Sequence, residues 1–168
     1  KISSPAFSIP LIEFFITKKN LLVWVATKKN LDVRVIDVTQ EKLTEDIKFF
    51  RDEIEKRLSI EESSKRLYQL LIKPIETLIE GSNNVCFVSH GILHYLPYTA
   101  LMDETGKFLL DKKVTFLAPS ASVFGFCIKK GDKLKKKLDD RSKIIAVANP
   151  NLGPGYDLPF AGKEAGPR

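Results

Sequence analysis

The sequence predicts an α/β protein whose mainly parallel β-sheet is flanked by helices and preceded by an antiparallel β-meander. Three observations support this fold class. The chain begins with three short strand-like runs that are joined by nearly identical polar connections. Residues 39–81 then carry apolar side chains at helical spacing. A short run of β-branched and aromatic residues follows at 85–88, bounded on both sides by turn formers, which is typical of a fully buried strand.

The meander is predicted within residues 1–38. Its strand-like runs are residues 11–17, 21–27 and 31–38. The pentapeptide Thr-Lys-Lys-Asn-Leu occurs at Thr17 and again at Thr27, and each copy joins two of these runs. Because asparagine tolerates a positive φ angle, such short connections indicate tight turns between antiparallel strands. In the third run Asp32 and Arg34 alternate with apolar residues, which predicts that one side of this strand faces solvent.

Two helices are predicted in a helical segment, residues 39–81. Thr39 is placed to cap the first helix with its side-chain oxygen. Apolar positions at intervals of four, three, four and four residues share one face of this helix: Leu43, Ile47, Phe50, Ile54 and Leu58. The second helix begins near residues 61–64, and Pro74 interrupts it. Since proline lacks an N–H group and crowds the preceding turn, we expect a kink or a new helix after Lys73.

Residues 82–168 are predicted to form the first part of the main sheet, with 85–88 as its central strand. Ser89 and His90 follow this strand directly. Ligands of parallel sheets bind outside the carboxyl ends of the strands, so these two residues are candidate substrate-binding residues in a cleft wall. For His90 a structural role in the turn is the favoured interpretation, the cleft wall comes second, and a catalytic role is the weakest of the three. The turn at 92–98 is too apolar for a solvent loop, and we expect it to pack back onto the sheet.

Further elements are predicted after residue 101. Short strands are expected at 108–110, 114–117 and 143–148. A helix is expected after Pro119, with Ser120 as its cap and three buried apolar residues, Val123, Phe124 and Phe126. Another helix is expected to begin within residues 158–165.

The chain offers few side chains for nucleophilic or metal chemistry. Its two cysteines, Cys86 and Cys127, are too few for a disulfide framework. Because both lie in apolar stretches, we expect them to be buried thiols. Cys86 and His90 are four residues apart on one predicted strand, ~13 Å, which is too far for a nucleophile and its base. His90 and His94 have the spacing of metal ligands on a helix, but the glycine and proline nearby oppose a helix. We therefore assign no catalytic residue, metal ligand or cofactor to this chain.

The net charge of +6 is concentrated in residues 129–143, a predicted basic loop with eight basic and three acidic side chains. Such a segment could contact nucleic-acid phosphates. No aromatic residues or glycine-rich pattern accompany its lysines, so we favour a solvated loop over nucleic-acid contact. No apolar run reaches the ~18–20 residues of a membrane span, and the first residues do not resemble a secretory leader. We expect a cytoplasmic protein without membrane contact.

Several short motifs follow one another along the chain. They are the helical residues 67–75, Gly-Ile-Leu-His-Tyr-Leu-Pro-Tyr at 91–98, Phe-Leu-Ala-Pro-Ser-Ala at 116–121, Asn149-Pro150, and Leu-Pro-Phe-Ala-Gly-Lys-Glu-Ala at 158–165. In their order and spacing these motifs resemble the CHAT domain, a caspase-like domain that is often fused to tetratricopeptide repeats. Ser89 and His90 depart from the family pattern, in which a pair similar to Pro-Asp is expected at that point.

The resemblance implies a caspase-like fold and a relationship to caspases, separase and gingipains, which are cysteine peptidases with a His-Cys dyad. In the family both catalytic residues lie after the Glu-Ala motif, so we expect them beyond Arg168. The chain is then the N-terminal part of a peptidase domain for protein or peptide substrates, inactive by itself, with fused or associated tetratricopeptide repeats as an implied partner. Its sheet would be unfinished, and an exposed edge would favour strand addition or self-association. The alternative is a catalytically silent module for protein interaction or signalling.

Overall fold

The computed structural model describes residues 9–135, with side chains described as far as Gly131. The chain divides into two compact units, Lys1–Asp132 and Lys133–Arg168, and the fold described below is that of the first. The predicted strand at 143–148 and the predicted helix at 158–165 lie outside the described residues. Within the described part, no helix combines the length and the apolar character needed to cross a membrane.

Three antiparallel strands form the predicted meander: β1 (Leu11–Ile16), β2 (Leu21–Ala26) and β3 (Leu31–Ile36). Threonine closes the connections between them. The Thr17 hydroxyl donates a hydrogen bond to the Asn20 carbonyl at 2.8 Å and accepts one from the Asn20 N–H at 2.9 Å, and the second connection repeats this pattern. Arg57 is the only non-glycine residue of the described part with a positive φ angle, so the expectation that asparagine supplies one is wrong.

The helical segment contains α1 (Gln40–Glu55) and α2 (Glu61–Leu71), as predicted. Thr39 caps α1, since its hydroxyl accepts a hydrogen bond from the Lys42 N–H at 3.2 Å. Pro74 lies in a 3₁₀ turn, η2 (Lys73–Ile75), and a short helix, α3 (Glu76–Ile79), follows. The helix therefore breaks where the proline predicted, while its apolar side remains buried on both sides of the break.

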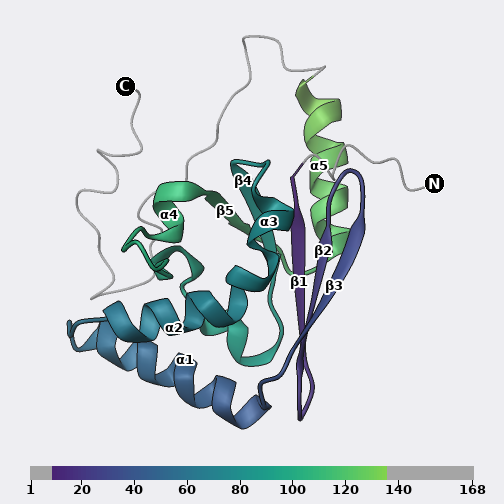
Figure 1. The fold of residues 1–168 in the computed structure, drawn as a ribbon. Coiled ribbons are helices and arrows are strands. Elements are labelled where there is room, and N and C mark those ends of the chain that lie inside the picture. The colour runs from purple at the N-terminus through teal and green to yellow at the C-terminus, as the bar shows by residue number, and fades with distance from the viewer. Residues whose placement is uncertain (1–8, 136–168) are drawn as a thin grey trace, which may run out of the picture. The chain divides into compact units, whose positions relative to one another are not determined.

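The predicted central strand, β4 (Asn84–Val88), runs parallel to β1 on one side and to β5 (Val114–Leu117) on the other. All five strands form one sheet in the order β3-β2-β1-β4-β5 (Figure 1). The meander is thus continuous with the parallel strands. This arrangement confirms the predicted α/β class, a sheet with an antiparallel extension and flanking helices.

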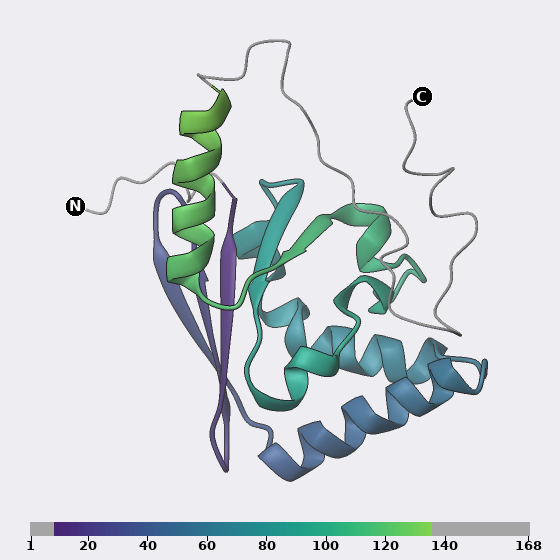
Figure 2. The same ribbon diagram turned by 180° about the vertical axis from the view of Figure 1, so that it is seen from behind.

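The sheet buries its two faces against different helices. The helices α1, α2 and α3 cover one face, and α5 (Ala121–Lys135) lies on the other (Figures 1 and 2). The main core lies under α1–α3, where the sheet contributes eight buried apolar side chains: Ile12, Phe14, Ile16, Leu21, Val23, Val25, Val85 and Phe87. On the opposite face, Ala121 and Phe124 of α5 pack near Leu11, Cys86 and Val88. Burial on both faces explains why β4 is apolar at every position from Val85 to Val88.

Three local expectations are corrected. Residues 108–110 do not form a strand, because α4 (Leu109–Lys112) begins there and the Phe108 N–H donates a hydrogen bond to the Asp111 carboxylate at 3.0 Å. Ser120 caps α5 as predicted, but two side chains expected to be buried, Val123 and Phe126, are exposed because the helix meets the sheet through the side that carries Phe124. Two apolar residues predicted on the face of α1, Ile54 and Leu58, are likewise exposed and lie outside the main core.

The predicted basic loop at 129–143 begins inside a helix. Its residues as far as Lys135 belong to α5, so the prediction of a loop is wrong for this part. The remainder of the basic segment lies outside the described residues.

The third strand has a solvent-facing side, as predicted, but that side is the apolar one. Leu31, Val33 and Val35 are 70%, 44% and 62% exposed, whereas Asp32 and Arg34 are only half-exposed. β3 is an edge strand of the sheet, and its apolar row lies on the face that α5 covers only in part. The alternation in the sequence therefore predicted which residues share a side of the strand, but not which of the two sides is covered.

Candidate functional site

The predicted site residues Ser89 and His90 lie where β4 ends, beside the end of its parallel neighbour β1. The Ile16 N–H donates a hydrogen bond to His90 Nδ1 at 3.1 Å, which joins the two strand ends. The imidazole also stacks on Phe15, with ring centroids 4.6 Å apart. Because Nδ1 accepts a hydrogen bond, the neutral ring carries its proton on Nε2, which is then the nitrogen able to donate to a ligand.

Ser89 is held by a tyrosine of the following turn. Its hydroxyl and that of Tyr98 lie 2.9 Å apart. Tyr98 is buried and stacks on Phe87, with ring centroids 4.3 Å apart and planes 7° from parallel. Burial raises the pKa of Tyr98 above its ordinary value, so its hydroxyl stays protonated at neutral pH. Ser89 is therefore paired with a neutral hydroxyl, which cannot activate it as a nucleophile.

The turn after β4 packs back onto the sheet, as predicted. It consists of two 3₁₀ turns, η3 (Gly91–Tyr95) and η4 (Tyr98–Ala100), and its buried side chains belong to the main core. Gly91 has a φ angle of 57°, and a Cβ atom there would lie 3.4 Å from Ile16 Cδ1, so glycine is favoured at this tight turn. His94 is exposed on the same turn. The packing of this turn on the main core thus holds Ser89 and His90 in place, whereas His94 is exposed and does not belong to the candidate site.

The two thiols differ. Cys86 is fully buried in β4, and burial raises its pKa to about 11, so the thiol is neutral at physiological pH. The prediction of a buried, inert thiol is confirmed for Cys86. It is wrong for Cys127, which is exposed on α5 because only the other side of that helix meets the sheet.

A second cluster of polar side chains was missed by sequence reasoning. Asp103 is buried and accepts hydrogen bonds from the Thr105 N–H at 2.8 Å and the Lys107 N–H at 3.0 Å, while the Lys112 ammonium lies 2.5 Å from its other oxygen. Burial opposes ionisation, but Lys112 and these hydrogen bonds outweigh it and hold the pKa of Asp103 well below its usual range. The spacing of Asp103 and Thr105 in a polar loop is typical of an Asx turn and was the available signal.

This cluster continues into the helices. Tyr68 on α2 donates a hydrogen bond to a Glu76 carboxylate oxygen at 2.7 Å, and Lys112 lies 3.4 Å from the same oxygen. Burial, together with the bond to Glu76, raises the pKa of Tyr68 to about 12. Lys112 thus bridges two carboxylates and joins α4 to α2 and α3. Its partners are satisfied by one another, so the cluster stabilises the fold and offers no unpaired acid or base.

No metal centre is found in the described part of the chain, where no three histidine, cysteine, aspartate or glutamate side chains come together closely enough to hold an ion. The pair Ser89 and His90 lies at the carboxyl end of β4 and presents a hydroxyl and an imidazole there. Its geometry fits a wall that contacts a ligand through a serine hydroxyl and an imidazole N–H.

The family model described as CHAT domain matches residues 61–165, which is more than half of the sequence. The match begins at the first residue of α2 and includes β4, the site residues and β5, whereas the meander and α1 precede it. No curated protein matches the chain.

Proposed function

The chain belongs to the CHAT domain family, and on this premise we propose that it is the N-terminal part of a caspase-like cysteine peptidase. The complete domain would hydrolyse peptide bonds in protein or peptide substrates. The observation that carries the proposal is the family match over a parallel β4–β5 pair whose carboxyl end presents Ser89 and His90. Substrates of such sheets bind at that end of the strands.

In the complete domain a cysteine thiolate would attack the peptide carbonyl, with a histidine as general base and backbone N–H groups around the developing oxyanion. We propose that both catalytic residues come from sequence beyond Arg168. Cys86 is a poor candidate for the nucleophile, because a buried neutral thiol needs a nearby base and His90 accepts its hydrogen bond from Ile16 instead.

The role proposed for this part is to shape the cleft. His90 is fixed by the Ile16 N–H and by Phe15, so it can present its Nε2 proton to a substrate carbonyl without losing side-chain freedom on binding. Ser89 is fixed by Tyr98 in the same way. Both residues would then contribute to substrate affinity and leave the chemical step to the catalytic pair.

The test is a peptide-library digest by the 168-residue chain and by the protein continued beyond Arg168. We expect cleavage by the longer protein only. In the longer protein, His90→Ala should raise KM about fivefold with little change in kcat, since it removes a contact made equally to substrate and transition state. His94→Ala, an exposed histidine on the same turn, is the matched control and should leave both constants unchanged.

Two results would contradict this proposal. Cleavage by the 168-residue chain that is abolished by Cys86→Ala or by Cys127→Ala would place the active site within this sequence. Absence of cleavage by the longer protein would favour the second candidate, a catalytically silent module for protein interaction or signalling. The observation that favours this second candidate is the wide apolar surface on one face of the sheet.

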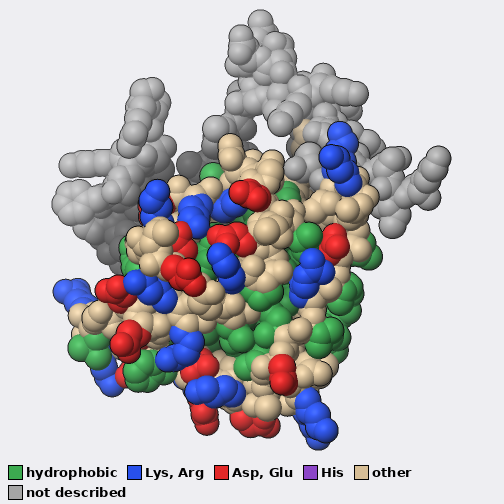
Figure 3. Space-filling model, viewed as in Figure 1, with side chains coloured by type: hydrophobic (Ala, Val, Ile, Leu, Met, Phe, Trp, Pro, Cys, Tyr) green, Lys and Arg blue, Asp and Glu red, His purple; other side chains and the backbone are tan. Residues whose placement is uncertain are grey.

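Three further points concern partners other than substrate and the cellular location. We propose fused or associated tetratricopeptide repeats as partners, because such repeats often accompany the CHAT domain, and a cytoplasmic location, which the two free cysteines support. Nucleic-acid contact through residues 129–143 is not favoured. On the side that carries α1, α2 and α3, Figure 3 shows basic and acidic side chains interspersed, without a patch of one sign. A measured affinity for nucleic acid that falls steeply as the salt concentration rises would support such contact after all.

A further inference from the structure

One face of the sheet is apolar and only partly covered. Alternation along β1, β2 and β3 directs nine side chains to this face, and the strand register sets them side by side. They are Leu11, Glu13, Phe15, Leu22, Trp24, Ala26, Leu31, Val33 and Val35. α5 reaches this face beside Leu11 and Ala26, whereas four of the nine are exposed: Phe15, Leu31, Val33 and Val35. Exposed apolar surface of this extent is typical of an interaction site.

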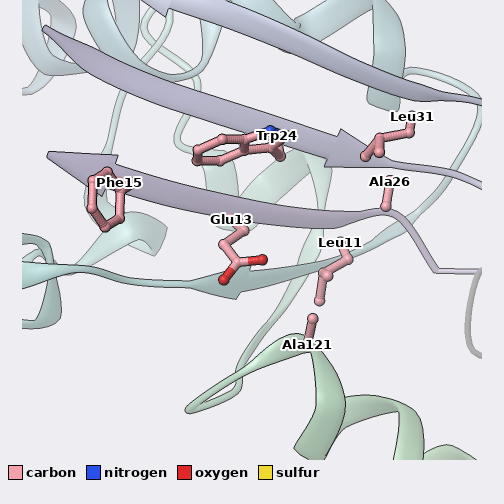
Figure 4. Close-up of a pocket in the computed structure, with 7 residues that line it drawn as sticks. All are labelled: Leu11, Glu13, Phe15, Trp24, Ala26, Leu31 and Ala121. Carbon is pink, nitrogen blue, oxygen red and sulfur yellow. The ribbon is translucent and has the colours of Figure 1, made fainter.

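The centre of this face is a groove with a single charge. The groove measures about 440 Å³ and is lined by Leu11, Glu13, Phe15, Trp24, Ala26, Leu31 and Ala121 (Figure 4). Glu13 is the only charged residue among the nine, and its carboxylate projects among the apolar side chains. No basic side chain of the described residues forms an ion pair with it. A molecule that covers the groove removes water from the Glu13 carboxylate. Such a molecule must therefore supply a cation, because a buried carboxylate without a partner is unfavourable.

We propose that this face is a docking site for an amphipathic helix of a partner protein, and that one lysine or arginine within the apolar stripe of that helix pairs with Glu13. α5 already shows that a helix fits this face, since Ala121 and Phe124 pack on it. β1 is six residues long, ~20 Å, which a helix of ~14 residues can cover. The groove borders the candidate site, because Phe15 lines the groove and also stacks on His90, but the inference does not depend on the proposed peptidase function.

A second copy of the chain is a poorer occupant. A symmetric dimer through this face would bring two Glu13 carboxylates to one apolar interface, and the face itself offers no cation for either. Carboxylates that lose water without gaining a partner oppose such an association. The lone acid therefore selects a basic partner and disfavours self-pairing, which is a common way to build specificity.

The experiment uses two synthetic helical peptides of 18 residues with leucine at positions spaced three and four apart. They differ only at the centre of the apolar stripe, which carries lysine in one peptide and glutamine in the other. Trp24 is the single tryptophan of the chain and lines the groove, so its emission should shift to shorter wavelength on binding. Anisotropy of labelled peptide gives the affinity independently. The lysine peptide should bind about tenfold more tightly than the glutamine peptide.

Variants separate charge recognition from folding. Glu13→Gln should abolish the preference between the two peptides, whereas Glu45→Gln, an exposed glutamate on α1, should preserve it. Leu31→Lys, at a position that is 70% exposed and therefore tolerant of substitution, should weaken both peptides while circular dichroism stays unchanged. Equal affinity of the unmodified chain for the two peptides, or binding of neither, would overturn the proposal. Sedimentation that shows a dimer dissociated by Leu31→Lys would also overturn it and assign the face to a second copy.

Discussion

The two faces of the sheet are built from the same strands and carry similar apolar side chains, but they are covered differently. Under α1, α2 and α3, Ile12 and Val25 are fully buried and Phe14 is 2% exposed. On the opposite face Leu31 and Val35 are mostly exposed. A β-strand with apolar residues on both sides therefore indicates two faces that can be covered, whereas the covering elements decide which of them contributes to stability. The four predictions that follow test this difference, from the largest expected effect to the smallest.

The first prediction compares phenylalanines on the two faces. Phe87→Ala should lower the free energy of unfolding by about 3–5 kcal/mol, because it removes a fully buried ring that stacks on Phe14 and Tyr98. Phe116→Ala, on the other face of the parallel strands, should lower it by about 1 kcal/mol or less, since Phe116 is partly exposed. Urea unfolding measures both. Equal losses would mean that the second face is covered as completely as the first.

The second prediction concerns the ion pair on the helix-covered side. Asp103→Asn should lower the free energy of unfolding by about 2 kcal/mol at pH 7, because it leaves Lys112 without its nearest charged partner. The pKa of Asp103 is depressed in the folded chain, so its stabilisation is complete above the unfolded pKa of about 4 and is lost as the pH falls below that value. Urea unfolding from pH 7 to pH 3 should show the two proteins converging at low pH. A difference that grows as the pH falls would contradict the assignment.

The third prediction compares the two cysteines. A small alkylating reagent should modify Cys127 readily and Cys86 very slowly in the native chain, with both modified after unfolding. Cys86 is buried, and its pKa of about 11 lowers the thiolate fraction at neutral pH by about 100-fold, whereas Cys127 is exposed on α5. Mass spectrometry of peptides after timed reaction measures both rates. Similar rates would show that α5 does not stay on the sheet.

The fourth prediction concerns the exposed row of β3. Val35→Thr should change the free energy of unfolding by no more than about 0.5 kcal/mol, because the side chain already faces solvent. Val23→Thr, at a buried position of the adjacent strand, is the matched substitution on the covered face and should lower stability by about 1–3 kcal/mol, because it buries a hydroxyl in the core. A large loss at Val35 would indicate that a partner or another copy covers this strand in solution.

Much of the fold could be predicted from local patterns. The three meander strands, the Thr39 cap, the break at Pro74 and the buried strand β4 all appear where the sequence placed them. The failures concern residues whose local pattern fits two structures. Phe108 begins a helical turn because Asp111 caps it, although three consecutive apolar residues also fit a strand. Val123 and Phe126 are exposed because the contact side of α5 is set by the sheet beneath it.

The candidate site shows the same division. Position in the sequence sufficed to place Ser89 and His90 at the end of a strand, because a buried apolar run followed by Gly91 has few other structures. The bond from the Ile16 N–H to His90 joins residues 74 apart in sequence, and no local pattern reports such a pair. The same is true of Tyr68, Glu76, Asp103 and Lys112, which come from three helices and a loop.

The sequence by itself determined most of the helices and strands, because turn residues, caps and the spacing of apolar side chains act within a few residues of the chain. Tertiary structure alone decided which apolar side chains are covered and which polar groups meet, since both depend on the order of strands in the sheet and on the helices that pack on it. Glu13 illustrates the limit. Its place in β1 is plain in the sequence, but only the pairing of β1, β2 and β3 shows it as the one charge on an apolar face.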